Sequence, residues 1–229
     1  FEQVCAAVQH AHRNLTIHRD LKPSNVLVTG DAPADAEVKL LDFGVAKLLD
    51  GAATGERAGT LTGAGLSPFT PGFAAPEQLG RGAVSTATDV YALGALLYVL
   101  LAGRVPLDAD QLTPAEAVLA VQTATPSPPS AVATDAAARA RGCADAARLA
   151  RALRGELDAI ALAALGPEPA RRYVTVDALA EDVRRHLARE RVTARPDTLG
   201  YRARTFARRR RALAIGTAVG AAALLLGSG

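Results

Sequence analysis

Two short polar motifs, joined by two runs of aliphatic residues, constrain the fold of this chain more than any other feature of its sequence. The first motif reads HRDLKPSN at residues 18–25, and the second reads LDFG at residues 41–44. Between them, residues 26–28 and 38–41 are strand-like and are separated by turn-forming glycine, aspartate and proline, which predicts a β-hairpin. Such a hairpin returns Asp42 to the end of the first motif.

The residue types in these motifs suit one kind of chemistry. A carboxylate such as Asp20 can orient a hydroxyl group and take its proton. Lys22 suits the negative charge that develops when a phosphoryl group is transferred. Asn25 and Asp42 supply amide and carboxylate oxygens, which are the hard ligands that Mg²⁺ prefers. A single loop can present the base, the cation and one metal ligand together.

A third motif, TPGFAAPE at residues 70–77, completes a recognisable set. In order and spacing, the three motifs resemble the large C-terminal lobe of bacterial serine/threonine protein kinases of the eukaryotic-like, membrane-anchored receptor type. The resemblance covers residues 1–190. It implies a protein-kinase-like α+β fold, of which this chain is the mainly helical large lobe with short β-hairpins and without the small lobe. It also implies ATP and Mg²⁺ as cofactors and protein substrates as acceptors.

The resemblance carries roles over to individual positions of this chain. It implies catalytic roles for Asp20, Lys22 and Thr70. A lysine two residues after the catalytic aspartate, as at Lys22, is typical of serine/threonine kinases rather than of tyrosine kinases. For binding of ATP and its metal it implies Leu27 beneath the adenine ring, together with Lys22, Asn25 and Asp42, with Asn25 and Asp42 as the metal ligands.

Seven further residues are implied to be structural or regulatory: His18, Arg19, Phe43, Gly44, Glu77, Asp89 and Arg172. In the family, Glu77 would form an ion pair with Arg172, and Asp89 would hold the backbone of the first motif. His18 and Phe43 would stack in the hydrophobic column that couples the two lobes.

Arg19 predicts regulation by phosphorylation. An arginine beside the catalytic aspartate typically binds a phosphate on the activation segment. Residues 45–69 are rich in glycine and alanine and contain hydroxyl side chains. We expect autophosphorylation at Thr60, Thr62 or Ser67. The alternative is that these hydroxyls only keep a loop soluble.

Several parts of a complete kinase are missing from this sequence. It contains no glycine-rich phosphate loop and no strand lysine with a helix glutamate partner, and it has no methionine. Residues 1–10 already have the pattern of a helix leading into the catalytic loop. We therefore expect a piece of a longer protein that is a kinase as a whole, whereas this piece alone does not turn over. Two cysteines, without a CxxC motif, indicate neither a zinc site nor a disulfide framework.

Helices are predicted through most of the remaining chain. Residues 87–102 are apolar on every side apart from one charge, which indicates a buried core helix too short to span a membrane. Thr113 followed by proline predicts a helix start. Residues 131–150 contain ten alanines and favour helix. Apolar residues recur at helical spacing in 157–164 and in 176–187.

The end of the sequence has a different character. Residues 191–211 are predicted to be a basic juxtamembrane segment, because 202–211 hold six arginines and no acidic residue. Residues 212–229 carry no charge and would span about 27 Å as a helix, close to the thickness of a bilayer core. We predict a transmembrane helix, complete or truncated at residue 229, with the kinase lobe on the cytoplasmic side of the inner membrane. The alternatives are a buried helix and a nucleic-acid-binding arm; with no binding motif beside the arginines, no nucleic-acid partner is predicted.

The leading functional hypothesis is transfer of the γ-phosphoryl group of ATP to Ser or Thr hydroxyls of proteins in a signalling pathway, with a homodimer as a possible partner for trans-autophosphorylation. The alternative is a non-catalytic pseudokinase or membrane-tethered scaffold. Pseudokinases usually lose the side chains that bind the metal and carry out the transfer. Here all four are retained, namely Asp20, Lys22, Asn25 and Asp42, which argues against this alternative. A small-molecule phosphotransferase is a further option, but Lys22 and the third motif together form a platform for a protein acceptor.

Overall fold

The computed structural model describes residues 1–30, 35–42, 71–80, 82–108, 112–196, 198 and 201. Within these ranges the chain is mainly helical with one β-hairpin, as the α+β prediction requires. The helices and strands are α1 (Glu2–Arg13), β1 (Val26–Thr29), β2 (Glu37–Leu40), α3 (Pro76–Leu79), α4 (Thr86–Ala102), α5 (Pro114–Thr123), α6 (Asp135–Ala140), α7 (Ala146–Leu153), α8 (Glu156–Ala164) and α9 (Val176–Leu187). Short 3₁₀ turns lie at Pro23–Asn25, Pro71–Phe73, Pro129–Ala131 and Pro169–Arg171.

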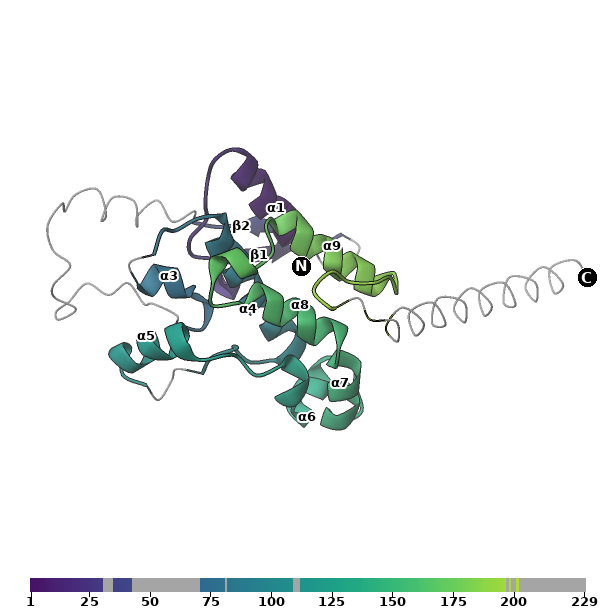
Figure 1. Ribbon diagram of the computed structural model, residues 1–229. Coiled ribbons are helices and arrows are strands. Elements are labelled where there is room, and N and C mark those ends of the chain that lie inside the picture. Colours follow the sequence, from purple (N-terminus) through teal and green to yellow (C-terminus); the bar gives the residue numbers. More distant parts are fainter. Residues whose placement is uncertain are drawn as a thin grey trace, which may run out of the picture.

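Helix α4 is the centre of the arrangement. It packs along α8, while α1 and α9 lie against each other and also contact α4. Figure 1 shows α5 and the pair α6–α7 toward opposite ends of the molecule, with the hairpin close to α1.

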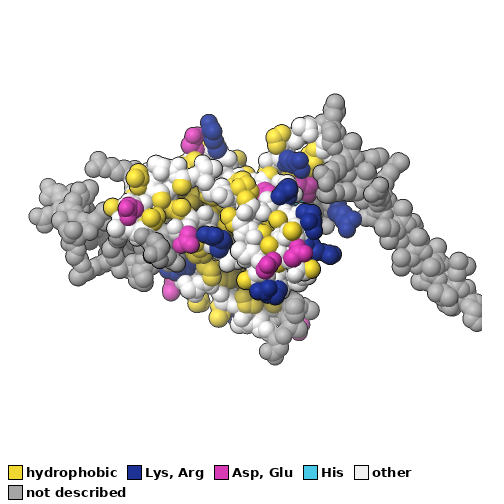
Figure 2. Space-filling view, turned by 90° about the horizontal axis from the view of Figure 1, so that it is seen from below, with side chains coloured by type: hydrophobic (Ala, Val, Ile, Leu, Met, Phe, Trp, Pro, Cys, Tyr) yellow, Lys and Arg dark blue, Asp and Glu magenta, His cyan; other side chains and the backbone are white. Residues whose placement is uncertain are grey.

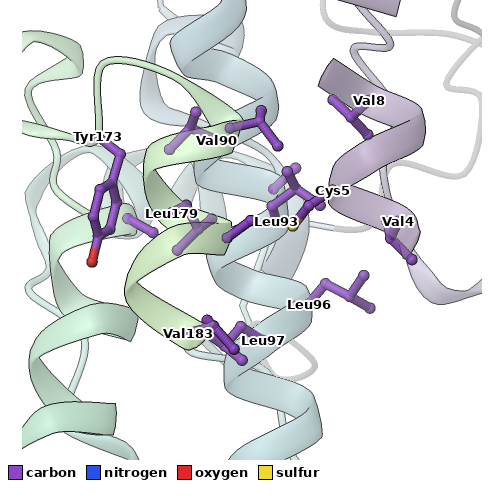
Figure 3. Packing of buried hydrophobic residues seen from close by; sticks show 14 of the residues in the cluster. Val4, Cys5, Val8, Val90, Leu93, Leu96, Leu97, Tyr173, Leu179 and Val183 are labelled. Atoms are coloured by element: carbon purple, nitrogen blue, oxygen red, sulfur yellow. The ribbon is translucent and has the colours of Figure 1, made fainter. Parts of the chain in front are cut away.

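The core is built around the apolar surface of α4. This helix was predicted to be a buried core helix, and Val90 and Leu93 are fully buried, whereas Leu100 near its end is 49% exposed. Figure 3 shows side chains of α1 and α9 projecting toward α4 from two directions. The labelled residues from α1 and α9 in this cluster are Val4, Cys5, Val8, Leu179 and Val183.

Local sequence sets the ends and the packing distance of α4. Ser85 begins the helix, and its backbone N–H donates to the hydroxyl of Thr88 at 3.2 Å. Gly103 ends it in the left-handed conformation, with φ of 77°, which glycine adopts without strain. A methyl group added at Gly94 would lie 2.6 Å from Cβ of Ala164. The absence of a side chain at Gly94 therefore allows α8 to approach α4 closely.

The predicted hairpin is present. Strands β1 and β2 are antiparallel, with Val26 opposite Leu40. The side chain of Gln3 on α1 holds the second strand: its amide donates to the carbonyl of Ala36 at 2.9 Å, and its oxygen accepts from the N–H of Val38 at 3.0 Å. The hairpin is thus fixed to the helix that precedes the first motif.

Local sequence also sets the ends of the helices after α4. Thr113 begins α5 as expected, since Glu116 N–H donates to its hydroxyl at 3.3 Å and Glu116 accepts from Thr113 N–H at 2.8 Å. The alanine-rich stretch 131–150, expected to favour helix, forms α6 and part of α7 with a break between them. Gly142 has φ of 67° and interrupts it, and Asp145 then caps α7 by accepting from the N–H of Arg148 at 2.6 Å.

The packed structure continues past residue 190, where the basic segment was predicted to begin. Asp182 on α9 is fully buried. Its carboxylate accepts hydrogen bonds from Thr193 N–H at 2.7 Å and from Ala194 N–H at 2.8 Å. Val192 is buried, and its N–H donates to the hydroxyl of buried Tyr201 at 3.0 Å. Residues 192–194 and Tyr201 therefore belong to the packed lobe.

Within the described ranges, no helix has both the length and the apolar character needed to cross a membrane. The predicted span at 212–229 and the arginine-rich stretch 202–211 lie outside those ranges. On the face shown in Figure 2, acidic side chains lie among the Lys and Arg side chains, with apolar groups between them. This mixed character is typical of a solvent-facing protein surface.

Candidate active site

One buried carboxylate anchors the loop that carries the first motif. Asp89, near the start of α4, has no exposed surface. Its Oδ2 accepts from the N–H of His18 at 2.8 Å, and its Oδ1 accepts from the N–H of Arg19 at 2.9 Å. The ring of His12 on α1 lies with Nε2 2.7 Å from the same Oδ2. The contact between Asp89 and the loop backbone, expected from the resemblance, is present.

The loop backbone is strained at the residue before Asp20. Arg19 has φ of 68°, a left-handed conformation that costs roughly 1–2 kcal/mol for a residue other than glycine. Hydrogen bonds hold both of its backbone polar groups, because its N–H donates to Asp89 and its carbonyl accepts from the side-chain amide of Gln78 at 2.7 Å. The conformation is thus stabilised from α4 and from α3 at once.

Asp20, Lys22 and Asn25 are brought together as their proposed roles require. The ammonium group of Lys22 lies 3.0 Å from Oδ2 of Asp20, and the two side chains are 20% and 34% exposed. The side-chain amide of Asn25 donates to the same carboxylate oxygen at 3.1 Å and to the backbone carbonyl of Asp20 at 2.7 Å. The carboxylate is therefore held in place while part of it stays accessible to an acceptor.

The expected metal ligands, Asn25 and Asp42, are linked through the backbone. The N–H of Leu41 donates to the carbonyl of Asn25 at 2.9 Å, which brings the residue before Asp42 against the catalytic loop. Since the amide nitrogen of Asn25 is bound to Asp20, its amide oxygen is the atom suited to a cation. Asp42 is exposed, with φ of 49°. One amide oxygen and one carboxylate fit Mg²⁺, which usually takes only one or two protein ligands beside phosphate and water.

Among the described residues, no three His, Cys, Asp or Glu side chains are grouped so that they could hold a metal ion. Leu27, expected beneath adenine, lies on β1 and is 46% exposed. The hairpin therefore has exposed apolar surface next to the cluster formed by Asp20, Lys22 and Asn25.

His18 is completely buried. Burial lowers the pKa of its imidazole, although the nearby carboxylate of Asp89 acts in the opposite direction. A neutral ring at neutral pH suits its predicted place in a hydrophobic column. Its predicted stacking partner, Phe43, lies outside the described residues.

The ion pair predicted at the end of the activation segment is present and bidentate. Arg172 donates to Oε1 and Oε2 of Glu77 at 2.7 and 2.8 Å. Arg172 also donates to the carbonyls of Gly166 and Ala87 at 2.6 and 2.8 Å. The hydroxyl of Thr88 donates to Glu77 at 2.9 Å. The pair thus fastens α3 to α4 and to the segment before α9.

Two opposing effects set the pKa of Glu77. Burial raises it, but hydrogen bonds from Arg172, from the backbone and from Thr88, with the charge of Arg172, outweigh burial and leave the pKa below its ordinary value. The carboxylate is therefore ionised at neutral pH. A buried pair of this kind holds its geometry firmly, but removing one partner leaves the other charge uncompensated.

Two residues that matter for the site were not identified from the sequence. His12 lies four residues after buried Val8 on α1, so helical periodicity could have placed it on the buried face. Gln78 directly follows the third motif and lies on a one-turn helix, where no periodic signal exists. Its contact with Arg19 joins residues 59 positions apart, and only the fold brings them together.

Thr70, Phe43, Gly44 and the expected phosphorylation sites Thr60, Thr62 and Ser67 lie outside the described residues. Their roles stay predictions.

Comparison with known proteins agrees with the geometry. A family model described as protein kinase domain matches residues 1–151. The chain is similar to the serine/threonine-protein kinase Pkn1 of Myxococcus xanthus, with 38% identity over 198 residues, covering 84% of this chain and 24% of that protein. It is similar to PknB of Mycobacterium tuberculosis, with 33% identity over 179 residues, covering 78% of this chain and 24% of that protein.

A solved structure agrees in fold. The PknI kinase domain of Mycobacterium tuberculosis, crystallised as a double mutant, superposes with a TM-score of 0.50 at 23% sequence identity, covering 79% of this chain and 51% of that one. The family match and the curated similarities establish that this chain belongs to the protein kinase family, with bacterial serine/threonine kinases among its relatives. The chain spans about a quarter of the length of these two curated relatives.

Proposed function

We propose that the complete protein containing this chain is a serine/threonine protein kinase, which transfers the γ-phosphoryl group of ATP to a hydroxyl group of a protein. One observation carries the proposal: the carboxylate of Asp20 lies within hydrogen-bonding distance of both the Lys22 ammonium group and the Asn25 amide. The loop that holds them is fixed to a buried carboxylate, Asp89. Such a fixed, charged and partly open cluster is what phosphoryl transfer requires of a protein.

Each group has a separate task in this reaction. Asp20 orients the acceptor hydroxyl and accepts its proton. Lys22, 3.0 Å from Asp20, stabilises the negative charge that moves onto the transferred group. Asn25 and Asp42 would hold Mg²⁺, which when bound neutralises charge on the phosphates of ATP. Leu27 would offer its exposed side chain to the adenine ring.

The direct test is a γ-labelled ATP assay with the complete gene product and a generic Ser/Thr protein acceptor. Asp20→Asn should lower kcat by about 10²–10⁴-fold, the usual contribution of a general base, and Asp42→Ala should remove the Mg²⁺-dependent signal. Asp177→Asn is the matched control, because this aspartate is 51% exposed and pairs with Arg13 on the surface. Activity retained in both site variants would refute the assigned roles.

The rival function is a pseudokinase or membrane-tethered scaffold. A folded complete protein that never labels an acceptor or itself, under conditions in which a control kinase is active, would favour this rival. The same assay on residues 1–229 alone tests the expectation that this part does not turn over. The family generally uses ATP and a divalent metal, so nucleotide binding can be measured independently of turnover.

Regulation through Arg19 is a second part of the proposal. Arg19 lies beside Asp20, and its guanidinium group suits a phosphate brought by the activation segment. Phosphopeptide mapping of active enzyme should find phosphate at Thr60, Thr62 or Ser67. An active enzyme with this segment unmodified would contradict it. If a homodimer carries out the reaction in trans, an active copy should label a copy inactivated by Asp20→Asn.

We infer membrane attachment from the sequence alone, because six arginines precede eighteen uncharged residues. The complete protein should remain with membranes after alkaline carbonate washing, with the kinase lobe protected from protease added outside intact cells. Release by carbonate would overturn the inferred anchor.

A further inference from the structure

The side chain of Gln78 connects α3 to the catalytic loop. Its side-chain amide donates to the carbonyl of Arg19 at 2.7 Å. Its side-chain oxygen accepts from the N–H of Ala75 at 3.0 Å. The second bond fixes which end of the amide faces the loop, because the oxygen is already bound within the segment that carries Gln78.

The carbonyl that Gln78 holds belongs to the peptide between Arg19 and Asp20. Arg19 is in the left-handed region, with φ of 68°, and a non-glycine residue leaves that region readily unless other groups prevent it. Asp89 holds the N–H of Arg19 at 2.9 Å, which fixes the peptide before Arg19. The bond from Gln78 acts on the next peptide, whose rotation would redirect the side chain of Asp20.

We propose that Gln78 is a positioning residue for phosphoryl transfer. By binding the Arg19 carbonyl, it keeps Asp20 aimed at the acceptor hydroxyl, and it couples the catalytic loop to the end of the activation segment. If the activation segment moves near Ala75, Gln78 moves with it and its hydrogen bond to the Arg19 carbonyl breaks. The Arg19–Asp20 peptide can then rotate. This inference rests on the proposed kinase function and adds a physical link between the order of that segment and the catalytic rate.

Two substitutions in the complete gene product separate this role from simple packing. Gln78→Glu keeps the shape and the acceptor for Ala75 but sets a carboxylate oxygen against the Arg19 carbonyl. Gln78→Leu removes both bonds at similar size. The matched control is Gln122→Leu, since Gln122 is an exposed residue of α5. Both Gln78 variants should lower kcat by about 10–100-fold, the scale expected for a misplaced catalytic group, with KM for ATP and the unfolding midpoint close to wild type.

A readout without turnover distinguishes this inference from the proposed function. Hydrogen exchange of a peptide covering residues 16–22 should become faster in the Gln78 variants and stay unchanged in Gln122→Leu. If the wild-type protein is inactive but exchange in residues 16–22 still becomes faster in the Gln78 variants, the proposed kinase function is refuted. The link between Gln78 and the catalytic loop is then supported. Unchanged kcat and unchanged exchange in an active enzyme would overturn the inference. A loss of kcat that follows a lowered unfolding midpoint, without faster exchange in the loop, would also overturn it.

Discussion

The catalytic loop and the apolar body of the lobe meet on one helix, α4, and they are held by different forces. Toward its start, α4 offers Asp89, whose two oxygens bind the loop backbone at 2.8 and 2.9 Å. Along its length it offers apolar side chains such as Leu93, which pack against α1 and α9. Apolar burial is strong but non-directional, whereas hydrogen bonds specify angles and distances. We therefore expect the core to determine stability and the polar anchors to determine the geometry of the site.

The largest effect on stability is expected at the ion pair between Glu77 and Arg172. Glu77→Ala should lower the free energy of unfolding by about 3–5 kcal/mol, because the buried guanidinium group loses its charge partner. Denaturant unfolding of the complete protein measures this. The control is Glu168→Ala, whose pair with Arg171 is exposed at 62% and 76% and contributes at most about 1 kcal/mol. Equal losses in both variants would contradict the account.

A comparable loss of stability, caused by lost apolar burial, is expected in the core. Leu93 has no exposed surface, so Leu93→Ala should lower the free energy of unfolding by about 2–5 kcal/mol through lost burial and a cavity. Leu187→Ala is the control, since this side chain is 68% exposed. If the two variants unfold at the same denaturant concentration, the core assignment is wrong.

Overpacking should be milder than either deletion. Gly94→Ala places a methyl group 2.6 Å from Cβ of Ala164, which forces α4 and α8 apart and should lower stability by about 1–3 kcal/mol. The second substitution Ala164→Gly should recover part of the loss, because it removes the opposing methyl group. Thermal unfolding of the single and double variants tests the coupling, and strictly additive losses would argue against the close approach.

The smallest expected effect is on the way stability depends on pH. The pKa of Glu77 is lowered from an ordinary value of 4.5 in the folded protein, so its carboxylate contributes stability that is complete above the unfolded pKa. That contribution is lost as the pH falls through the lowered folded pKa. Wild type should therefore lose stability below about pH 4.5 more steeply than Glu77→Gln. Parallel profiles for the two proteins would refute the assigned shift.

The sequence was most informative where a residue acts through a local motif or a regular period. Asp20, Lys22 and Asn25 lie within one loop, so their spacing alone placed them together. The pairing of Glu77 with Arg172 and of Asp89 with the loop followed from the family resemblance. The buried helix around Leu93 followed from its uniform apolar character.

Other features depend on contacts that no local pattern encodes. Gln78 reaches Arg19 only because α3 folds back against the catalytic loop. Helix-forming alanines extend across residues 131–150, yet Gly142 and the cap at Asp145 divide the stretch in two. Asp182 looks like a surface charge on an amphipathic helix, but residues 192–194 fold over it and bury it. In each case tertiary contact decides what propensity leaves open.

The comparison between loop and core is tested most directly by measuring kcat and the unfolding midpoint together for Asp89→Asn and Leu93→Ala in the complete protein. Asp89→Asn replaces one acceptor oxygen by an N–H donor facing the loop, so kcat should fall by about 10²-fold. Leu93→Ala should lower the midpoint by roughly 5–15 °C and leave kcat, measured well below that midpoint, within about twofold of wild type. A loss of kcat in proportion to lost stability in both variants would contradict the division between polar anchors and apolar core.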